Sequence, residues 1–183
     1  MRTSGLPTAA ARRDALFVLV MGAFMLLPAV ACTLAWSGTP AAAGAASPSG
    51  AVAVAGVIDG DTIRVRLDGR DQKVRLIGVN TPEVDWYGGR AECYGSEAAL
   101  YARHRLLGRS VRLGFDMRRL DPYGRVLAYV YVGRELFNLT LVTNGYAEAD
   151  PVPPDTRLAS LFSRAESGAR SRGAGMWSVC PES

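Results

Sequence analysis

The feature that most constrains the fold is a period-two alternation of side chains broken by Asp68-Gly69. Apolar residues alternate with arginines over residues 63–67, and a second alternating segment covers residues 72–79. Asp-Gly between two such segments is a strong signal for a β-hairpin. Because successive side chains of a strand point to opposite faces, Arg75 is predicted to lie on the face away from the core, displayed rather than buried.

After the hairpin the hydrophobic period changes to that of a helix and back again. The expected elements are, in order, a helix at 97–107 ended by Gly108, strands at 111–115 and 125–132 with a tight turn at 121–124 between them, and helices at 136–143 and 155–172. Short strands with an inserted helix predict a small β-barrel of the OB type with helices packed outside, in the α+β class.

The first 36 residues are typical of a targeting segment. A basic start ends in Arg12-Arg13, and an apolar run follows over residues 15–36. Ala29-Val30-Ala31 has the small-x-small pattern of a signal-peptidase site, although the run, about 33 Å long as a helix, would also span a bilayer. We expect export, with the segment either cleaved as a signal peptide or retained as a membrane anchor. Lipidation of Cys32 is a third outcome.

Residues 37–55 consist of Ala, Gly, Ser, Pro and Val and are predicted to be a linker. The folded domain is then expected to cover residues 56–180. The protein is predicted to be secreted or displayed on the cell surface, associated with the membrane through residues 15–36 if they are retained, and monomeric.

Export changes the interpretation of the cysteines, because an oxidising compartment permits disulfides. Cys32 lies in the targeting segment, so Cys93 and Cys180 remain as a pair, and a disulfide between them is the economical prediction. Two unrelated buried thiols are the alternative. A bridge would be structural, because both positions lie outside the segments that carry chemistry. Two cysteines with His104, which falls on the polar side of its helix, do not make a zinc site of the usual spacing.

Residues with catalytic potential gather in three short segments at predicted strand ends. Asp59-Gly60-Asp61-Thr62 is an acidic turn, Asn80-Thr81-Pro82-Glu83 follows the strand that carries Arg75, and Tyr123-Gly124-Arg125 places a second arginine at a strand start. Oxygen ligands suit Ca²⁺, arginines bind phosphate, and a carboxylate can activate water. The combination matches what phosphodiester hydrolysis requires. From Val57 onward 18 basic and 16 acidic residues give a net charge of about +2, which is too small to imply a polyanion partner by the overall field alone.

Several longer motifs occur in a fixed order. They are Ile58-Asp59-Gly60-Asp61-Thr62, Val74-Arg75-Leu76-Ile77-Gly78-Val79-Asn80-Thr81-Pro82-Glu83, Tyr94-Gly95 with Glu97-Ala98, Asp121-Pro122-Tyr123-Gly124-Arg125, and Gly175-Met176-Trp177-Ser178. Together they resemble a staphylococcal-type thermonuclease domain over about two thirds of the chain. The resemblance implies an OB-fold barrel of five strands with three helices, one Ca²⁺, and hydrolysis of DNA and RNA at the 5′ side of the phosphodiester.

The resemblance also implies a role for individual residues. Asp61, Asn80 and Thr81 would be metal ligands, Thr81 through its backbone carbonyl. Glu83 would act as general base, Arg75 and Arg125 would stabilise the transition state, and Tyr123 would lie beside the bound nucleotide.

Two departures from the best-studied member stand out. Asn80 replaces a second metal-binding aspartate, and its amide oxygen can ligate but brings no charge. Residues 147–150 lack the tyrosines that in that member stack near the nucleotide base. This difference predicts weaker or differently shaped substrate binding.

Two other classes of function fit an OB barrel. The first is a non-catalytic module that binds single strands or a protein partner, and the second is a surface-anchored structural spacer. The presence of Arg75, Glu83 and Arg125 together favours the enzyme, because a binding module does not need all three.

Overall fold

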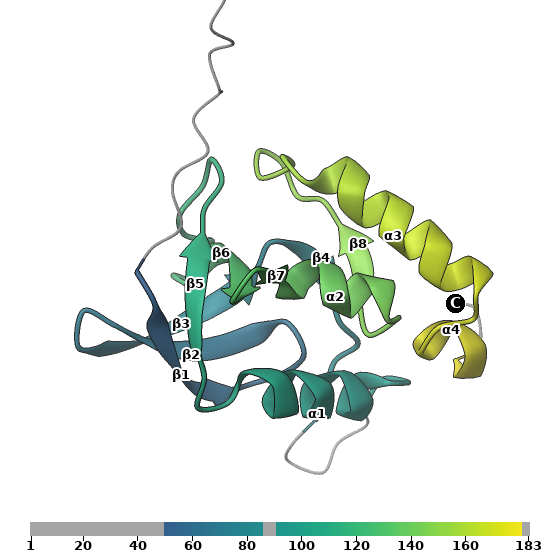
Figure 1. Ribbon diagram of the computed structural model, residues 1–183, viewed down its shortest axis with the longest axis horizontal. Helices are drawn as coiled ribbons and strands as arrows, with labels where there is room; N and C mark the ends of the chain where they lie inside the picture. Colours follow the sequence, from purple (N-terminus) through teal and green to yellow (C-terminus); the bar gives the residue numbers. More distant parts are fainter. Residues whose placement is uncertain (1–49, 86–90, 181–183) are drawn as a thin grey trace, which may run out of the picture. The chain divides into compact units, whose positions relative to one another are not determined.

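The computed structural model describes residues 50–85 and 91–180 (Figure 1). The strands are β1 Val52–Val57, β2 Thr62–Leu67, β3 Arg70–Leu76, β4 Gly78–Asn80, β5 Ser110–Gly114, β6 Val126–Val132, β7 Glu135–Leu136 and β8 Glu148–Asp150. The helices are α1 Gly95–Leu106, α2 Phe137–Thr143, α3 Ala159–Ser171 and the short α4 Met176–Val179. The predicted targeting segment and most of the predicted linker lie outside the described residues. Within those residues, no helix is both long enough and apolar enough to cross a bilayer.

Five strands form a closed barrel. They are hydrogen-bonded in the order β3-β2-β1-β5-β6, and a parallel pairing between β3 and β6 closes the ring. The hairpin predicted around Asp68-Gly69 is β2–β3, which pair from Thr62↔Arg75 to Leu67↔Arg70. The barrel and the helices α1, α2 and α3 confirm the predicted OB-type α+β fold.

The barrel begins earlier in the chain than the sequence predicts. β1 starts at Val52, inside the segment interpreted as linker, and pairs with both β2 and β5. The boundary placed at residue 56 is therefore wrong by four residues. β1 contains only valine, alanine and glycine, so its hydrophobic periodicity is weak. The segment forms a strand because it pairs with two neighbouring strands.

The segment predicted as one strand over residues 72–79 is divided between β3 and β4. Gly78 has a φ of 76°, and a Cβ on it would lie 2.6 Å from the Phe162 ring. The buried Asn138 side chain donates a hydrogen bond to the Ile77 carbonyl at 2.9 Å and so satisfies the backbone at the break. The turn at Gly78 sends the chain away from the barrel to pair with β8, and this sets the direction of residues 80–83.

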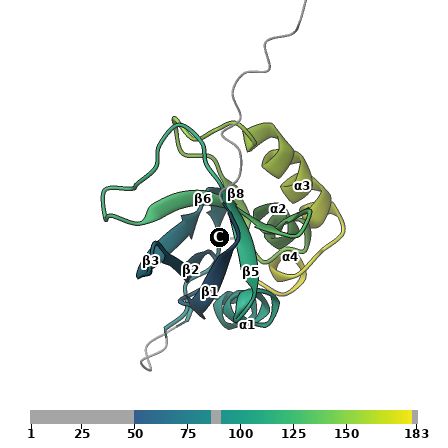
Figure 2. The same cartoon turned by 60° about the vertical axis from the view of Figure 1, so that its left-hand side comes forward.

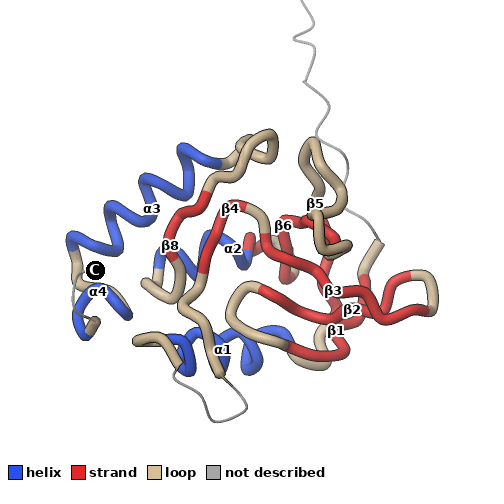
Figure 3. Tube along the Cα trace, turned by 180° about the vertical axis from the view of Figure 1, so that it is seen from behind, coloured by secondary structure: helices blue, strands red, loops and turns tan. Residues whose placement is uncertain are grey.

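The helices pack outside the barrel. α1 lies along one end of it in Figure 1, with His104 exposed as expected. Figure 2 shows α2 and α3 side by side, and Figure 3 shows β4 and β8 paired between the barrel and α3. The core fills the barrel and continues beneath these helices; Ile63, Leu113, Phe137 and Phe162 are each at most 1% exposed.

Candidate active site

The acidic turn at residues 59–62 is built around one carboxylate. Oδ1 of Asp59 accepts the backbone N–H groups of Asp61 at 2.9 Å and Thr62 at 2.6 Å. A Cβ at Gly60 would lie 2.7 Å from Cγ2 of Thr81, so only glycine allows this close approach. The first and second predicted site segments are therefore in direct contact.

Asp61 is the buried centre of the site, at 4% exposed. Its Oδ2 accepts the backbone N–H of Thr81 at 2.8 Å and the Thr81 hydroxyl at 3.1 Å. Its Oδ1 accepts the hydroxyl of Thr62 at 3.2 Å and forms an ion pair with Arg75. A buried carboxylate needs this many partners because burial penalises its charge.

Arg75 is not displayed as the alternation predicts. It lies on the expected face, but its side chain is only 17% exposed, and it forms an ion pair with Asp61. Nη2 donates to Oδ1 of Asn80 at 3.0 Å. Burial lowers the pKa of the guanidinium, as does the neighbouring Arg125, while the negative charge of Asp59, Asp150 and Glu83 acts to raise it.

The same field acts on Asp59. Burial raises its pKa above the ordinary value, against the opposing effects of the hydrogen bonds from Thr62 and the positive charges of Arg75 and Arg125. Charges from all three predicted segments thus influence one another, which indicates a single site.

Arg125 is oriented by Asp121, a residue that the sequence analysis treated only as part of a turn. Asp121 accepts the backbone N–H groups of Tyr123 at 2.9 Å and Arg125 at 2.8 Å, and Nε of Arg125 at 2.5 Å. Burial alone would raise the pKa of Asp121, but the bonds from Arg125 and Tyr123 hold it below its ordinary value. Tyr123 is 85% exposed, and the Arg125 guanidinium lies 5.6 Å from its ring centroid.

A cavity of about 240 Å³ opens beside the two arginines. Tyr123 lines it together with Val152 and Asp150, which belongs to the residue 147–150 segment noted for its missing tyrosines. The cavity therefore has an edge of arginine, whose chemistry suits phosphate, and a mixed polar and apolar wall.

The donor set for a cation consists of oxygens. Oδ1 of Asp61 and Oδ1 of Asn80 both contact the Arg75 guanidinium, so the two atoms converge on one positive charge. Within residues 50–85 and 91–180 no three or more His, Cys, Asp or Glu side chains cluster as a metal site would need. A site here would depend on amide and backbone oxygens as well as carboxylates, which fits a hard cation such as Ca²⁺.

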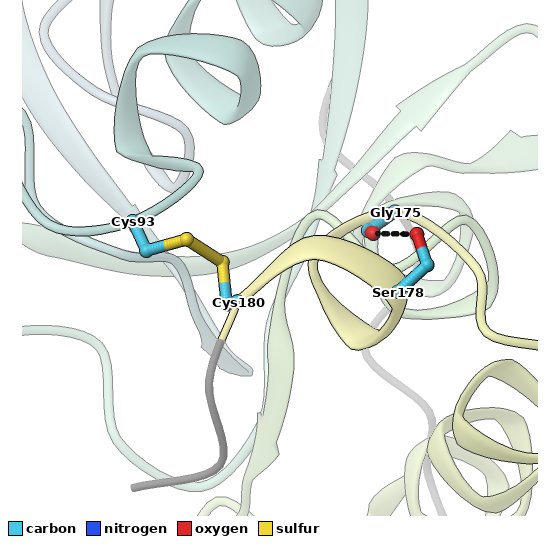
Figure 4. Close-up of a disulfide and its surroundings, with 4 residues drawn as sticks. All are labelled: Cys93, Gly175, Ser178 and Cys180. Atoms are coloured by element: carbon cyan, nitrogen blue, oxygen red, sulfur yellow. Dashed lines mark hydrogen bonds between the residues drawn. A yellow bond between two sulfur atoms is a disulfide. The ribbon is translucent and has the colours of Figure 1, made fainter.

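Glu83 lies after Thr81 in a segment without helix or strand, with its side chain exposed. Its backbone N–H donates to Oε2 of Glu92 at 2.8 Å, and its carbonyl accepts the Glu92 N–H at 3.0 Å. Sequence reasoning missed Glu92, since nothing local pairs it with a residue nine positions earlier. The next residue, Cys93, is bonded to Cys180 with a Cα–Cα distance of 5.8 Å (Figure 4). Cys93 lies outside the three catalytic segments, as expected, but it directly follows a residue that is hydrogen-bonded to one of them.

The structure is that of an OB barrel with Arg75 and Arg125 on one cavity, and with Asp61 and Asn80 bonded to Arg75, which is the chemistry of a barrel suited to phosphate. The sequence profile of the family described as "Staphylococcal nuclease homologue" matches residues 73–179. The chain belongs to this family.

Curated relatives agree with this assignment. The thermonuclease of Staphylococcus intermedius is 40% identical over 121 residues, which are 66% of this chain and 72% of that protein. The thermonuclease of Staphylococcus hyicus is 39% identical over 122 residues, 67% of this chain and 72% of that protein. Endonuclease YncB of Bacillus subtilis (strain 168) is 36% identical over 123 residues, 66% of this chain and 58% of that protein.

Proposed function

We propose that this protein is a Ca²⁺-dependent nuclease that hydrolyses the phosphodiester bonds of DNA and RNA. As a member of a nuclease family with thermonuclease and endonuclease relatives, it is a hydrolase that acts on nucleic acids. The observation that supports the finer proposal best is that the Arg75 guanidinium contacts both Asp61 and Asn80, with Glu83 three residues beyond Asn80.

In this proposal the arginines stabilise the transition state. Attack on a phosphodiester adds negative charge to the oxygens of a five-coordinate phosphorus. Arg125, held by Asp121, and Arg75 would each donate to these oxygens, and a partly buried guanidinium acts more strongly than one in water. For Arg75 this requires exchange of its bonds to Asp61 and Asn80 for bonds to phosphate.

Glu83 is proposed as the general base. It would accept a proton from the attacking water as the new P–O bond forms and the P–O bond on the 5′ side breaks. The leaving oxygen would take a proton from solvent, and Glu83, which is exposed, would return its proton to solvent. Tyr123, exposed at the cavity, would lie against the nucleotide.

The proposed cation would be held by Asp61, Asn80 and the backbone carbonyl of Thr81. When bound, Ca²⁺ supplies positive charge that polarises a phosphoryl oxygen. The bonds from Thr81 to Asp61 orient that carboxylate before any ligand arrives.

Export remains part of the proposal. Residues 1–36 would direct the chain out of the cytoplasm as a signal peptide or as an anchor that associates it with the membrane, and the domain would act as a monomer. The bond between Cys93 and Cys180 supports an oxidising destination.

The test is a digest of supercoiled plasmid and of RNA by the purified domain, with Ca²⁺ or with a chelator. We expect cleavage of both substrates with Ca²⁺, none with the chelator, and a loss of about a hundredfold or more in Glu83→Gln with an unchanged circular dichroism spectrum. Tight binding of nucleic acid without cleavage would instead support the non-catalytic OB module. Cleavage that is equal in Glu83→Gln would remove Glu83 from the mechanism.

A further inference from the structure

We propose that Glu92 is a positioning residue for Glu83, and that the Cys93–Cys180 disulfide holds the turn that carries Glu92. The inference rests on the proposed role of Glu83 as general base. Neither Glu92 nor the Cys93–Cys180 disulfide has a role in the mechanism proposed above.

Glu83 needs support from outside its own segment. Residues 81–85 belong to no helix or strand. Thr81 is hydrogen-bonded to Asp61, Pro82 has no N–H to donate, and the pair of bonds between Glu83 and Glu92 anchors the backbone of the next residue. The side-chain bond from Oε2 of Glu92 fixes the Glu83 amide, and the main-chain bond fixes its carbonyl.

The turn that carries Glu92 is packed directly on Glu83. The N–H of Gly95 donates to the Glu92 carbonyl at 3.0 Å, which closes the turn at the start of α1. A Cβ at Gly95 would lie 2.2 Å from the Glu83 carbonyl oxygen. Only glycine leaves room for this contact, so the first residue of α1 packs directly against the Glu83 backbone.

The disulfide ties the same turn to the far end of the chain. Cys93 follows Glu92 directly, and Cys180 follows α4, whose backbone is anchored by the Met176 N–H to the Gly145 carbonyl at 2.9 Å. Ser178 donates to the Gly175 carbonyl at 2.9 Å within the same helix turn, close to the disulfide in Figure 4. The turn is thus held by α1 on one side and by the C-terminal segment on the other.

Such support has a consequence for rate. A general base acts only within hydrogen-bond reach of its proton, and a displacement of about 1 Å can cost about a hundredfold in rate. Substrate phosphate is bound by Arg75 and Arg125, which the turn does not contact in any described bond. Loss of the turn is therefore expected to lower kcat and to leave KM nearly unchanged.

The first experiment compares Glu92→Ala, Glu92→Gln and Glu97→Ala in the exported domain. Glu92→Ala should lower kcat by about tenfold or more with KM within about twofold, while Glu92→Gln, which keeps an acceptor oxygen, should restore most of kcat. Glu97→Ala is the matched control, since it removes the same charge from the first turn of α1 and should behave as wild type. Wild-type kcat in Glu92→Ala, or equal losses in the Ala and Gln variants, would overturn the proposal.

The second readout is hydrogen exchange of the Glu83 amide, measured by NMR without Ca²⁺ or substrate. Exchange should accelerate in Glu92→Ala and remain near wild type in Glu92→Gln. This readout separates two failures. If Glu83→Gln is active, Glu83 is not the general base. The exchange rate of the Glu83 amide in Glu92→Ala then still shows whether Glu92 holds the Glu83 backbone. An inactive Glu83→Gln with unchanged exchange and kcat in Glu92→Ala would refute the positioning alone.

The disulfide is tested with the Cys93→Ser/Cys180→Ser double variant, at a temperature where circular dichroism shows it folded. We expect faster exchange at the Glu83 amide and a lower kcat, again with KM little changed. If the double variant does not fold, the wild type reduced with dithiothreitol below its melting transition gives the same readout. Unchanged exchange and kcat without the bond would show that it has no effect on Glu83.

Discussion

At the scale of single residues, Arg75 and Arg125 are held in different ways. Arg75 is buried between Asp61 and Asn80, whereas Arg125 is oriented by one carboxylate, that of Asp121. The bonds to Asp121 fix the Arg125 guanidinium before substrate binds, which favours stabilisation of the charge that develops in a transition state, whereas Arg75 must first exchange its bonds to Asp61 and Asn80.

Arg75→Ala and Arg125→Ala should each lower kcat by about a hundredfold or more, because each removes a donor to the transition state. Steady-state rates on plasmid DNA measure this, with circular dichroism to verify the fold. The matched control is Arg64→Ala, an exposed arginine of β2, which should keep its kcat. Similar losses in all three variants would indicate a diffuse basic surface instead.

Asn80→Asp should shift half-maximal activation to a lower Ca²⁺ concentration, because an added carboxylate generally tightens a Ca²⁺ site. A Ca²⁺ titration of activity gives the midpoint. Asn144→Asp makes the same change at the exposed end of α2 and should leave the midpoint where it is. An unchanged midpoint in Asn80→Asp would mean that residue 80 does not ligate the ion through its side chain.

Asp121→Asn should destabilise the fold by about 1 kcal/mol at neutral pH. The pKa of Asp121 lies below its ordinary value of 3.8. The charged carboxylate therefore stabilises the folded state at pH values above 3.8, and this stabilisation is lost as the pH falls through the lower pKa of the folded state. The difference in unfolding free energy between variant and wild type should therefore shrink at acid pH. Urea titrations at neutral and acid pH measure it.

Asp71→Asn is the control for Asp121. The ion pair of Asp71 with Arg66 is exposed on both side chains, at 46% and 60%, and exposed pairs contribute little. If the difference in unfolding free energy between Asp121→Asn and the wild type does not depend on pH, the charge of Asp121 does not stabilise the folded state.

At the scale of elements, the β2–β3 hairpin carries positive charge on the face that holds Arg75. Arg64 lies directly opposite Lys73 in the register, and both are exposed. Like charges opposite each other are unfavourable in a sheet unless an anion lies between or above them.

Arg64→Ala and Lys73→Ala should each reduce the salt dependence of binding to long DNA, because each cation that neutralises a phosphate releases about one counterion. The slope of log Kd against log salt should fall by about one unit per variant while kcat stays constant. Arg134→Ala, an exposed arginine outside the hairpin, is the control. An unchanged slope would place the substrate path elsewhere.

At the scale of the whole molecule, the disulfide closes a loop between positions 87 residues apart. Constraining the unfolded chain over such a loop stabilises the folded state by about 4 kcal/mol in the chain-entropy model.

Loss of the bond should therefore lower the Tm by roughly 10 °C. Differential scanning calorimetry of the oxidised protein and the Cys93→Ser/Cys180→Ser variant measures this. Mass spectrometry of the non-reduced exported protein is the companion measurement, and free thiols at both positions would rule out the bridge.

The sequence by itself determined the barrel and the identity of its candidate site residues. Period-two alternation around Asp68-Gly69 and the helical periods that follow depend on local geometry, so the hairpin, α1 and α2 were predictable. The ordered motifs then named the family, as the profile match bears out. β1 was missed, because its small residues give little hydrophobic contrast before they are paired.

Tertiary structure decided what surrounds those residues. Arg75 is mostly buried where the fold brings Asp61 and Asn80 to its guanidinium, and Asp121 acquires a role because its carboxylate reaches Arg125. Glu92 meets Glu83 through a turn that α1 and a distant cysteine hold in place. Burial and hydrogen bonding between segments far apart in the chain depend on where the folded backbone brings them together, and no local pattern of residues encodes that distance.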